Sequence, residues 1–320
     1  MATHAMRTAP VADAAQEFLG DVMAGLALRP RRIPSKYFYD ALGSALFEQI
    51  CATPEYYLTR CELELMQIHR SDIAARLGAH VQLVEFGSGA GIKTRLLLDA
   101  LDHPVCYTPV EISESALASS CAALTRDFPD LEIHPCSADF TRLHRLPAAS
   151  LRSPRRVVYF AGSTLGNFED REAITLLANM REIAGPKGAV LVGVDLKKDP
   201  AIIEAAYNDA EGVTAAFTLN LLTRINRELG SDFDVSSFAH RARYNRILGR
   251  IETQIVSLRP QRVHLDRRSF DFCRDEAIEV EISCKYDHAD VQRMAQSAAL
   301  SVQAIWTDHN QWFALVLLTA

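Results

Sequence analysis

The residues with the clearest chemical potential form a glycine-rich turn between an apolar run and a helix-like segment. The segment reads Val84-Glu85-Phe86-Gly87-Ser88-Gly89-Ala90-Gly91-Ile92-Lys93. Glycine permits a tight turn and lets a ligand approach the backbone, and the N-terminus of the helix that follows favours negative charge. A dinucleotide-binding fingerprint needs its third glycine at position 92, where the sequence has Ile92. The spacing therefore disfavours a nicotinamide dehydrogenase.

The pattern E-x-G-x-G-x-G in this turn resembles the first motif of the S-adenosylmethionine-dependent methyltransferases, whose cofactor has no pyrophosphate. The resemblance implies that Gly87 and Gly89 line the cofactor. Lys93 could reach the carboxylate of its methionine part, because a helix N-terminus repels cations and is an unusual place for a lysine. An ordinary solvent-facing lysine is the alternative for Lys93.

Two acidic residues follow the next strand-like runs. Glu111 comes 24 residues after Gly87, where a carboxylate can accept hydrogen bonds from both ribose hydroxyls of an adenosine. Asp139, which precedes Phe140, could accept from the adenine amino group while the backbone reads the ring. A surface carboxylate is the alternative for Glu111 and a plain loop residue is the alternative for Asp139. We favour the cofactor roles because both residues occur together with the glycine turn.

A second polar segment follows the run 156–161, and it reads Gly162-Ser163-Thr164-Leu165-Gly166-Asn167-Phe168. The methyl acceptor meets the cofactor here in class I methyltransferases. The Asn167 amide offers both a donor and an acceptor. Alternatively Asn167 caps the next helix, a position for which Asp170 is equally suited.

Aromatic and acidic residues elsewhere allow two interpretations each. Tyr56 and Tyr57 come just before Thr59 and Glu62, whose T-x-x-E spacing predicts a capping box and a helix start. Tyrosines are usually half-buried packing residues, and Tyr207 has the same ambiguity. Period-two alternation in 279–284 places Glu281 and Ser283 on one face of a strand. Together they could hold a basic or polar ring, or they could lie on a solvated edge.

The elements that must position these residues alternate between strand and helix from about residue 72 to 197, which indicates βαβ units and a mainly parallel sheet. We expect strands at 81–86, 105–112, 131–136, 156–161 and 189–195, with helices at 94–101, 113–127 and 170–183. Later runs predict helices at 201–207, 213–229 and 289–298, β-structure at 250–257 and 278–284, and a hairpin of 302–306 with 312–318. The fold class is therefore α/β, and the sheet with its C-terminal antiparallel hairpin resembles the Rossmann-like sheet of class I methyltransferases.

This order of elements also predicts two domains. Residues 60–199 plus 284–320 form the cofactor-binding domain. Residues 10–59 plus 200–283 form a smaller substrate-binding domain.

Composition narrows the function classes. The 320 residues are 48% hydrophobic and 23% charged, as in ordinary globular proteins. The net charge of −6 disfavours a nucleic-acid or anionic-membrane partner and hence a nucleic-acid methyltransferase.

The cysteines and histidines indicate the compartment and the absence of a metal site. Seven scattered cysteines without a C-x-x-C pair indicate reduced thiols in the cytoplasm. The ten histidines are dispersed and no metal site is expected. No segment approaches the roughly 18 apolar residues of a membrane span, and we expect a cytoplasmic monomer.

Taken in order, five motifs resemble the L-histidine Nα-methyltransferases of ergothioneine biosynthesis, from about residue 30 to the C-terminus. They are Tyr37-Phe38-Tyr39-Asp40-x-x-Gly43-Ser44-x-Leu46-Phe47, Pro54-Glu55-Tyr56-Tyr57-x-Thr59-Arg60, Gly87-Ser88-Gly89 with Lys93-Thr94, Gly162–Phe168, and Glu281-Ile282-Ser283. The resemblance implies trimethylation of the histidine α-amino group to hercynine, with three S-adenosylmethionine molecules consumed. Two departures are Ala90-Gly91, where members often carry hydroxyl side chains, and Thr253, where a larger apolar neighbour of the substrate ring is expected.

The resemblance also implies the site residues. Tyr57, Asn167 and Tyr207 would act in catalysis by holding the amine and carboxylate of the substrate, beside Gly162. Glu281 and Ser283 would bind the imidazole. The cofactor-binding set would be Gly87, Gly89, Lys93, Glu111, Asp139 and Phe140.

Two other functions remain open. The chain could methylate another amino acid, such as an aromatic one, or a dipeptide. It could instead be a catalytically inactive regulatory protein that binds the cofactor, although the polar set at 57, 167, 207, 281 and 283 counts against this.

Overall fold

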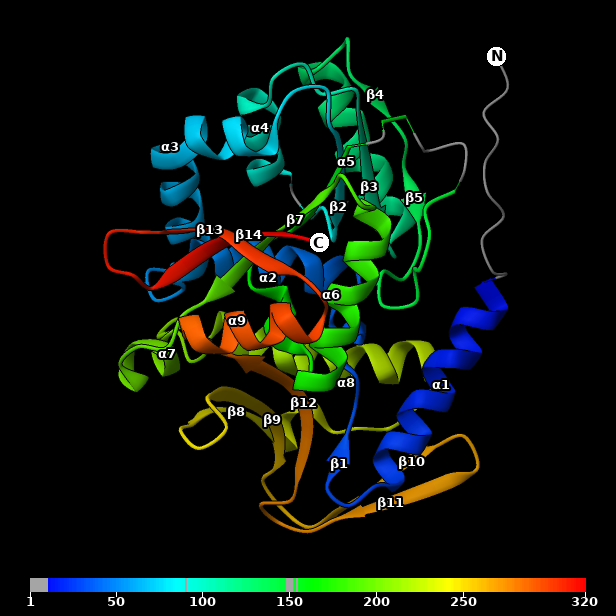
Figure 1. Cartoon of the computed structure of the whole chain (residues 1–320). Coiled ribbons are helices and arrows are strands. Elements are labelled where there is room, and N and C mark those ends of the chain that lie inside the picture. The colour runs from blue at the N-terminus through cyan, green and yellow to red at the C-terminus, as the bar shows by residue number, and fades with distance from the viewer. Residues whose placement is uncertain (1–10, 90, 148–151, 154) are drawn as a thin grey trace. The chain divides into compact units, whose positions relative to one another are not determined.

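The computed structural model describes residues 11–89, 91–147, 152–153 and 155–320 (Figure 1). These residues form two compact units. Unit 1 contains the described residues up to Tyr57 together with Lys198–Ser283, and unit 2 contains Leu58–Lys197 together with Cys284–Ala320. The chain therefore passes between the units three times.

Unit 2 is built on a mostly parallel sheet whose strand order is β13-β14-β7-β6-β2-β3-β4, with β5 pairing β3 (Figure 1). Its parallel strands include β2 (Gln82–Phe86), β3 (Cys106–Glu111), β6 (Arg156–Phe160) and β7 (Ala189–Asp195). Strand β14 (Phe313–Thr319) runs antiparallel to both β7 and β13 (Ser301–Thr307). The predicted sheet and its C-terminal hairpin are confirmed.

The predicted strand at 131–136 differs from the structure. Two short pieces, β4 (Glu132–Ile133) and β5 (Cys136–Ser137), pair separately with β3. Pro135 lies between them and has no N–H to donate, so it interrupts the strand.

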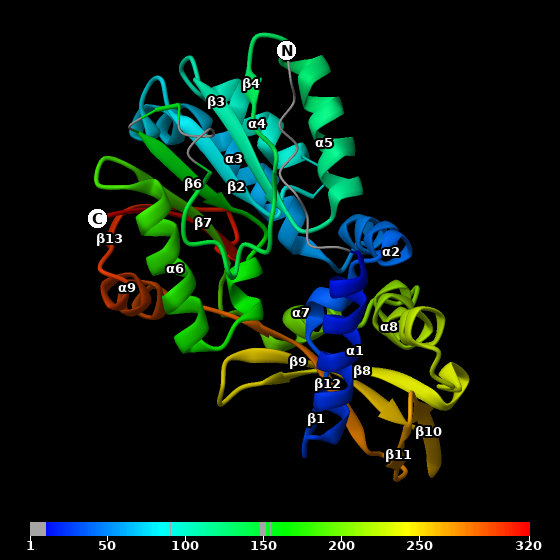
Figure 2. The ribbon, with the colours of Figure 1, turned by 90° about the vertical axis from the view of Figure 1, so that its right-hand side faces the viewer.

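Alternation along β2 gives the sheet of unit 2 two different faces. Val84 and Phe86 belong to the apolar core that contains buried residues of α6 (Asp170–Ala184) and α9 (His288–Ser297). Figure 2 shows α6 beside β6 and β7, the two strands that it contacts. Because successive side chains of a strand point to opposite faces, Glu85 faces away from this core. Helix α6 buries Ala173, Leu176, Leu177, Met180 and Ile183, the spacing of an amphipathic helix.

The remaining helices of unit 2 are α3 (Tyr57–Leu77), α4 (Ile92–Ala100) and α5 (Glu114–Asp127). Ser113 caps α5 by accepting from the Ala116 N–H. The predicted capping box at Thr59 and Glu62 is wrong. Helix α3 already begins at Tyr57, the last residue of unit 1, so Thr59 lies inside it and Glu62 is fully buried.

Unit 1 contains a second sheet, of order β1-β12-β9-β8, and a separate hairpin. The sheet strands are β1 (Arg31–Arg32), β8 (Phe238–Asn245), β9 (Arg250–Ser257) and β12 (Ala277–Cys284), and the hairpin is β10 (Gln261–Leu265) with β11 (Arg268–Phe272). Its helices are α1 (Val11–Ala27), α2 (Ala41–Ala52), α7 (Pro200–Ala205) and α8 (Val213–Leu229), with α2 packed on α8. None of the helices in the described ranges is long and apolar enough to cross a membrane.

Candidate functional site

The glycine turn after β2 has the backbone that only glycine adopts easily. Gly87, Gly89 and Gly91 have φ angles of 71°, 47° and 71°. A Cβ added to Gly89 would meet no atom within 4 Å, and one on Gly87 would meet only the Phe140 ring, at 3.9 Å. The Ser88 Oγ is buried without a hydrogen-bond partner in the described part of the chain. Because a buried hydroxyl usually has a partner, the turn suits a polar ligand such as the amino-acid part of S-adenosylmethionine.

Glu85 fixes this turn to the helix that follows it. Its Oε2 accepts hydrogen bonds from the Thr94 hydroxyl at 2.7 Å and the Tyr107 hydroxyl at 2.5 Å. Burial raises the pKa of Glu85 to about 7, against the lowering effect of these two bonds. The acidic residue of the motif thus joins β2, β3 and α4.

Lys93, the second residue of α4, is paired with a carboxylate that the sequence analysis had assigned to a helix cap. Its Nζ lies 2.5 Å from Glu62 Oε2. A Cβ on Gly162 would lie 3.4 Å from the same Nζ. The structure therefore brings together two predicted residues, Lys93 at the start of α4 and Gly162 in the turn after β6.

Glu111 is the last residue of β3, as expected for a ribose ligand. Its Oε1 accepts from the backbone N–H groups of Ile112 at 2.9 Å and Ser113 at 3.2 Å. Burial raises the pKa of Glu111, and the two backbone bonds oppose that rise. These two bonds use Oε1 alone, and the ribose role of Glu111 stays a prediction.

We expect Glu111→Ala to weaken cofactor binding by about tenfold to a hundredfold, because it removes a charged acceptor of hydrogen bonds. Isothermal titration calorimetry with S-adenosylhomocysteine measures the change. Glu114→Ala is the matched control, since Glu114 is exposed three residues further on. Equal affinities for the Glu111 variant and the wild type would exclude the ribose role.

Asp139 and Phe140 follow β5 and already have protein partners. Asp139 Oδ1 accepts from the Thr141 N–H at 2.9 Å and the Thr141 hydroxyl at 2.6 Å, which is the geometry of a loop turn. The Phe140 ring stacks on Phe86 with centroids 5.6 Å apart and meets Phe160 edge-on at 5.3 Å. The adenine role of this pair stays a prediction.

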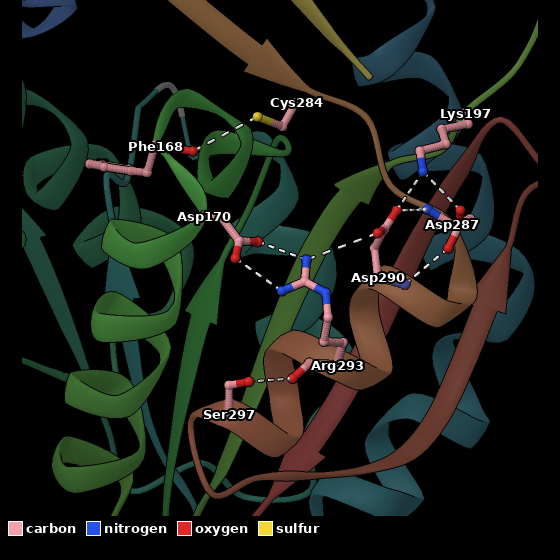
Figure 3. A network of polar contacts seen from close by, with 8 residues as sticks. All are labelled: Phe168, Asp170, Lys197, Cys284, Asp287, Asp290, Arg293 and Ser297. Carbon is pink, nitrogen blue, oxygen red and sulfur yellow. Dashed lines mark hydrogen bonds and ion pairs between the residues drawn. The ribbon is translucent and has the colours of Figure 1, made fainter. Parts of the chain in front are cut away.

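The segment Gly162–Phe168, which follows β6, is fixed near both ends by contacts with other parts of unit 2. Ser163 has a left-handed backbone with φ of 59°, and its Oγ accepts from the Asp195 N–H at 2.8 Å. Gly166 packs so tightly that a Cβ would lie 2.8 Å from the Cys284 carbonyl oxygen. The Cys284 thiol also contacts the Phe168 carbonyl oxygen at 3.8 Å (Figure 3). The turn that carries Asn167 is therefore fixed against the residue that follows Ser283.

Asn167 is the half-buried last residue of a short 3-10 helix, Thr164–Asn167. Neither Asn167 nor Asp170 caps α6, because Glu169 is its N-cap and forms a capping box with Glu172. Asp170 instead binds Arg293 of α9 at 2.7 Å (Figure 3). The cap alternative for Asn167 is therefore wrong, and its role in substrate binding stays a prediction.

Ion pairs hold unit 2 where the chain leaves and re-enters it. Lys197 binds Asp287 at 2.8 Å and Asp290 at 2.7 Å (Figure 3). Beside them Lys285 binds Asp195 at 2.8 Å, and both of these side chains are completely buried. The carboxyl end of β7 and the segment after β12 are therefore joined by a buried charge pair.

In unit 1, Tyr57 is buried at the start of α3 and contacts a lysine. The Lys198 ammonium donates to the Tyr57 hydroxyl at 2.8 Å and lies 4.4 Å from the ring centroid. The ring thus already takes part in a cation–π contact. Lys198 belongs to none of the motifs that predict the site.

Two other predicted residues of unit 1 meet directly. The Tyr207 hydroxyl and the Ser283 Oγ are 2.8 Å apart. His240 holds the Tyr207 backbone, because its Nε2 donates to the Tyr207 carbonyl oxygen at 2.9 Å and its Nδ1 lies 3.0 Å from the Thr218 hydroxyl. Burial lowers the pKa of His240, so its neutral form is favoured.

Glu281 lies half-buried on β12, two residues before Ser283. Burial raises the pKa of Tyr56 well above its usual value, and the nearby charges of Tyr207 and Glu281 add to that rise. The Tyr56 ring meets Tyr207 edge-on with centroids 6.3 Å apart. Glu281, Tyr56, Tyr207 and Ser283 thus form one polar and aromatic group in unit 1.

Comparison with known sequences decides the family. A sequence model described as "Histidine-specific methyltransferase, SAM-dependent" matches residues 18–320. The chain belongs to this family. A histidine N-alpha-methyltransferase of Mycolicibacterium smegmatis is 38% identical over 96% of this chain and 96% of its own length. One of Mycobacterium tuberculosis is 38% identical over 93% of each chain. The ergothioneine biosynthesis protein 1 of Neurospora crassa is 28% identical over 88% of this chain and 32% of its own length.

The histidine-specific methyltransferase family is S-adenosylmethionine-dependent, and the sheet of unit 2 is that of the class I methyltransferases. Three residues that contact predicted site residues were not themselves predicted to belong to the site. They are Glu62, which contacts Lys93, Lys198, which contacts Tyr57, and His240, which contacts Tyr207. One signal was available for Glu62, because it lies at helical spacing among the buried Leu58, Cys61, Leu65 and Met66. A carboxylate on the apolar face of a helix needs buried partners.

Proposed function

We propose that this chain transfers methyl groups from S-adenosylmethionine to the α-amino nitrogen of L-histidine, three times over, to give hercynine in the ergothioneine pathway. The observation that carries this proposal is the group in unit 1 where Tyr207 and Ser283 are hydrogen-bonded beside the half-buried Glu281. A carboxylate and two hydroxyls offer acceptors and donors to both nitrogens of an imidazole. Family membership supports the same substrate.

The cofactor supplies an activated sulfonium methyl group, so the protein mainly positions an unprotonated amine in line with it. The residues that would hold the cofactor are Gly87, Gly89, Lys93, Glu111, Asp139 and Phe140. Lys93 would bind the carboxylate of its methionine part and Glu111 the ribose. The open backbone at Gly89 fits this assignment, and so does the Ser88 hydroxyl, which has no partner among the described residues.

The substrate would be held at both ends. Glu281 would accept from an imidazole N–H and Ser283 would pair with the other ring nitrogen. Tyr57, Asn167 and Tyr207 would hold the amine and carboxylate, beside Gly162. The Tyr57 ring already attracts the Lys198 ammonium, and an aromatic face of this kind tolerates the quaternary ammonium that repeated methylation creates.

The partners and the location follow from the same chemistry. The acidic balance of −6 supports a small-molecule substrate rather than a nucleic acid or an anionic membrane. The scattered cysteines support a reducing, cytoplasmic compartment. We propose that the protein acts there as a monomer, with unit 1 as the substrate-binding domain.

Incubation with L-histidine and methyl-labelled S-adenosylmethionine tests the function, with mass spectrometry counting methyl groups per product. We expect three methyl groups on the α-nitrogen. Tryptophan, tyrosine and histidine dipeptides form the comparison panel. Thr253 motivates it, because this buried residue stands where a larger apolar one was expected and its Oγ1 has no partner within the described ranges. Methylation of a panel member but not of histidine would favour a different substrate, and cofactor binding without any product would favour a regulatory protein.

A further inference from the structure

The position of Lys93 needs a compensating charge. Lys93 is the second residue of α4, whose first turn contains no acidic residue. The partial positive charge of a helix N-terminus destabilises a cation there. The compensating charge comes from another helix, because Glu62 Oε2 of α3 lies 2.5 Å from Lys93 Nζ.

Glu62 is completely buried, and both of its carboxylate oxygens have donors. Oε2 accepts from the Gly162 N–H at 3.0 Å in addition to Lys93. Oε1 accepts from the Tyr159 hydroxyl at 3.1 Å. A buried carboxylate is tolerated only when it is paired and hydrogen-bonded. Glu62 thus ties together the start of α4, strand β6 and the turn that follows β6.

The sheet leaves room for this carboxylate. Gly193 lies in the middle of the buried strand β7, where a side chain would normally pack. A Cβ on Gly193 would lie 2.8 Å from Glu62 Oε1 and 2.9 Å from the Phe313 ring. Because Gly193 has no side chain, the Glu62 carboxylate can occupy the space beside this strand position.

We propose that Glu62 is a positioning residue for the cofactor: it fixes the Lys93 ammonium and the Gly162 backbone in the arrangement that receives the cofactor's carboxylate. An ammonium has three protons, so Lys93 can bind Glu62 and a ligand carboxylate together. This inference rests on the proposed function, in which Lys93 binds that carboxylate. It adds a residue that itself makes no contact with the ligand.

A double-mutant cycle tests the inference, with titration calorimetry of S-adenosylhomocysteine against the full chain. Glu62→Gln keeps the size of the side chain and removes its charge. We expect Glu62→Gln and Lys93→Met each to weaken binding on the order of tenfold to a hundredfold. The double variant should bind no more weakly than Lys93→Met alone, because Glu62 acts through Lys93. In steady-state kinetics the KM for S-adenosylmethionine should rise and the KM for histidine should not.

Glu64→Gln is the matched control, since Glu64 lies on the same helix and pairs with the exposed His309 at 2.7 Å. Glu62→Asp keeps the charge but shortens the side chain by one methylene, which moves the carboxylate away from Lys93. This variant should weaken cofactor binding, and it tests the inference even if the glutamine variant does not fold. Wild-type affinity in Glu62→Gln or Glu62→Asp, or additive effects in the double variant, would overturn the inference. Unchanged affinity in Lys93→Met would instead contradict the cofactor assignment on which the proposed function depends.

Discussion

The Glu281→Ala variant should have a KM for histidine raised by roughly a hundredfold or more, because a site built to pair a polar group discriminates strongly when the pair is lost. The KM for S-adenosylmethionine should stay unchanged. Glu281 lies half-buried on β12 near Tyr56 and Tyr207, two residues before the buried Ser283. Initial rates at varied histidine and fixed saturating cofactor measure the effect.

The same strand provides the control for this experiment. Glu279 is also an acidic residue of β12, but it pairs with the exposed Arg32 at 3.4 Å. Glu279→Ala should therefore leave both KM values unchanged. If the Glu281 variant retained wild-type kinetics for histidine, Glu281 would have no part in substrate binding.

The second large effect concerns stability. Lys285→Met should lower the free energy of unfolding by about 3–5 kcal/mol, because it leaves the completely buried Asp195 carboxylate without its charged partner. Urea denaturation followed by circular dichroism measures the loss. Adding Asp195→Leu to Lys285→Met should recover most of it, since replacing both ions by apolar groups removes the buried charge.

Arg293→Met is the comparison for this variant. Arg293 binds Asp170 at 2.7 Å, a distance similar to that of the Lys285 pair (Figure 3). The Arg293 and Asp170 side chains are about half exposed, however, at 50% and 54%. Exposed ion pairs contribute about 0–1 kcal/mol, so this variant should unfold nearly as the wild type does. Equal losses in Lys285→Met and Arg293→Met would show that the burial of the Asp195 pair has no energetic consequence.

Local patterns were sufficient for much of the fold. The apolar run 189–195, the amphipathic run 213–229 and the run 250–257 are strand β7, helix α8 and strand β9 within the predicted bounds. Each of these signals lies within one element, in the period of its hydrophobic residues. Strand β8 was missed because its sequence, FAHRARYN, alternates weakly and carries several charges.

The site was harder to predict, since its contacts join residues that are far apart in the sequence. The spacing of Thr59 and Glu62 is a local capping signal, but tertiary packing overrides it, and Glu62 pairs with Lys93 and Gly162. The contact between Tyr207 and Ser283 likewise joins the turn that follows α7 to β12. The resemblance named both residues, whereas only the structure shows that they touch.

The order of strands in unit 2 has a consequence for biosynthesis. The neighbour of β7 on one side is β14, so this edge of β7 stays unpaired until residues 198–283 of unit 1 and the α9 segment have been translated. Strand β7 is entirely buried in the finished protein, and an apolar unpaired edge is a template for aggregation. The nascent chain therefore has an unpaired, apolar strand edge from the synthesis of β7 until β14 (Phe313–Thr319) has been made, a stage at which aggregation competes with folding.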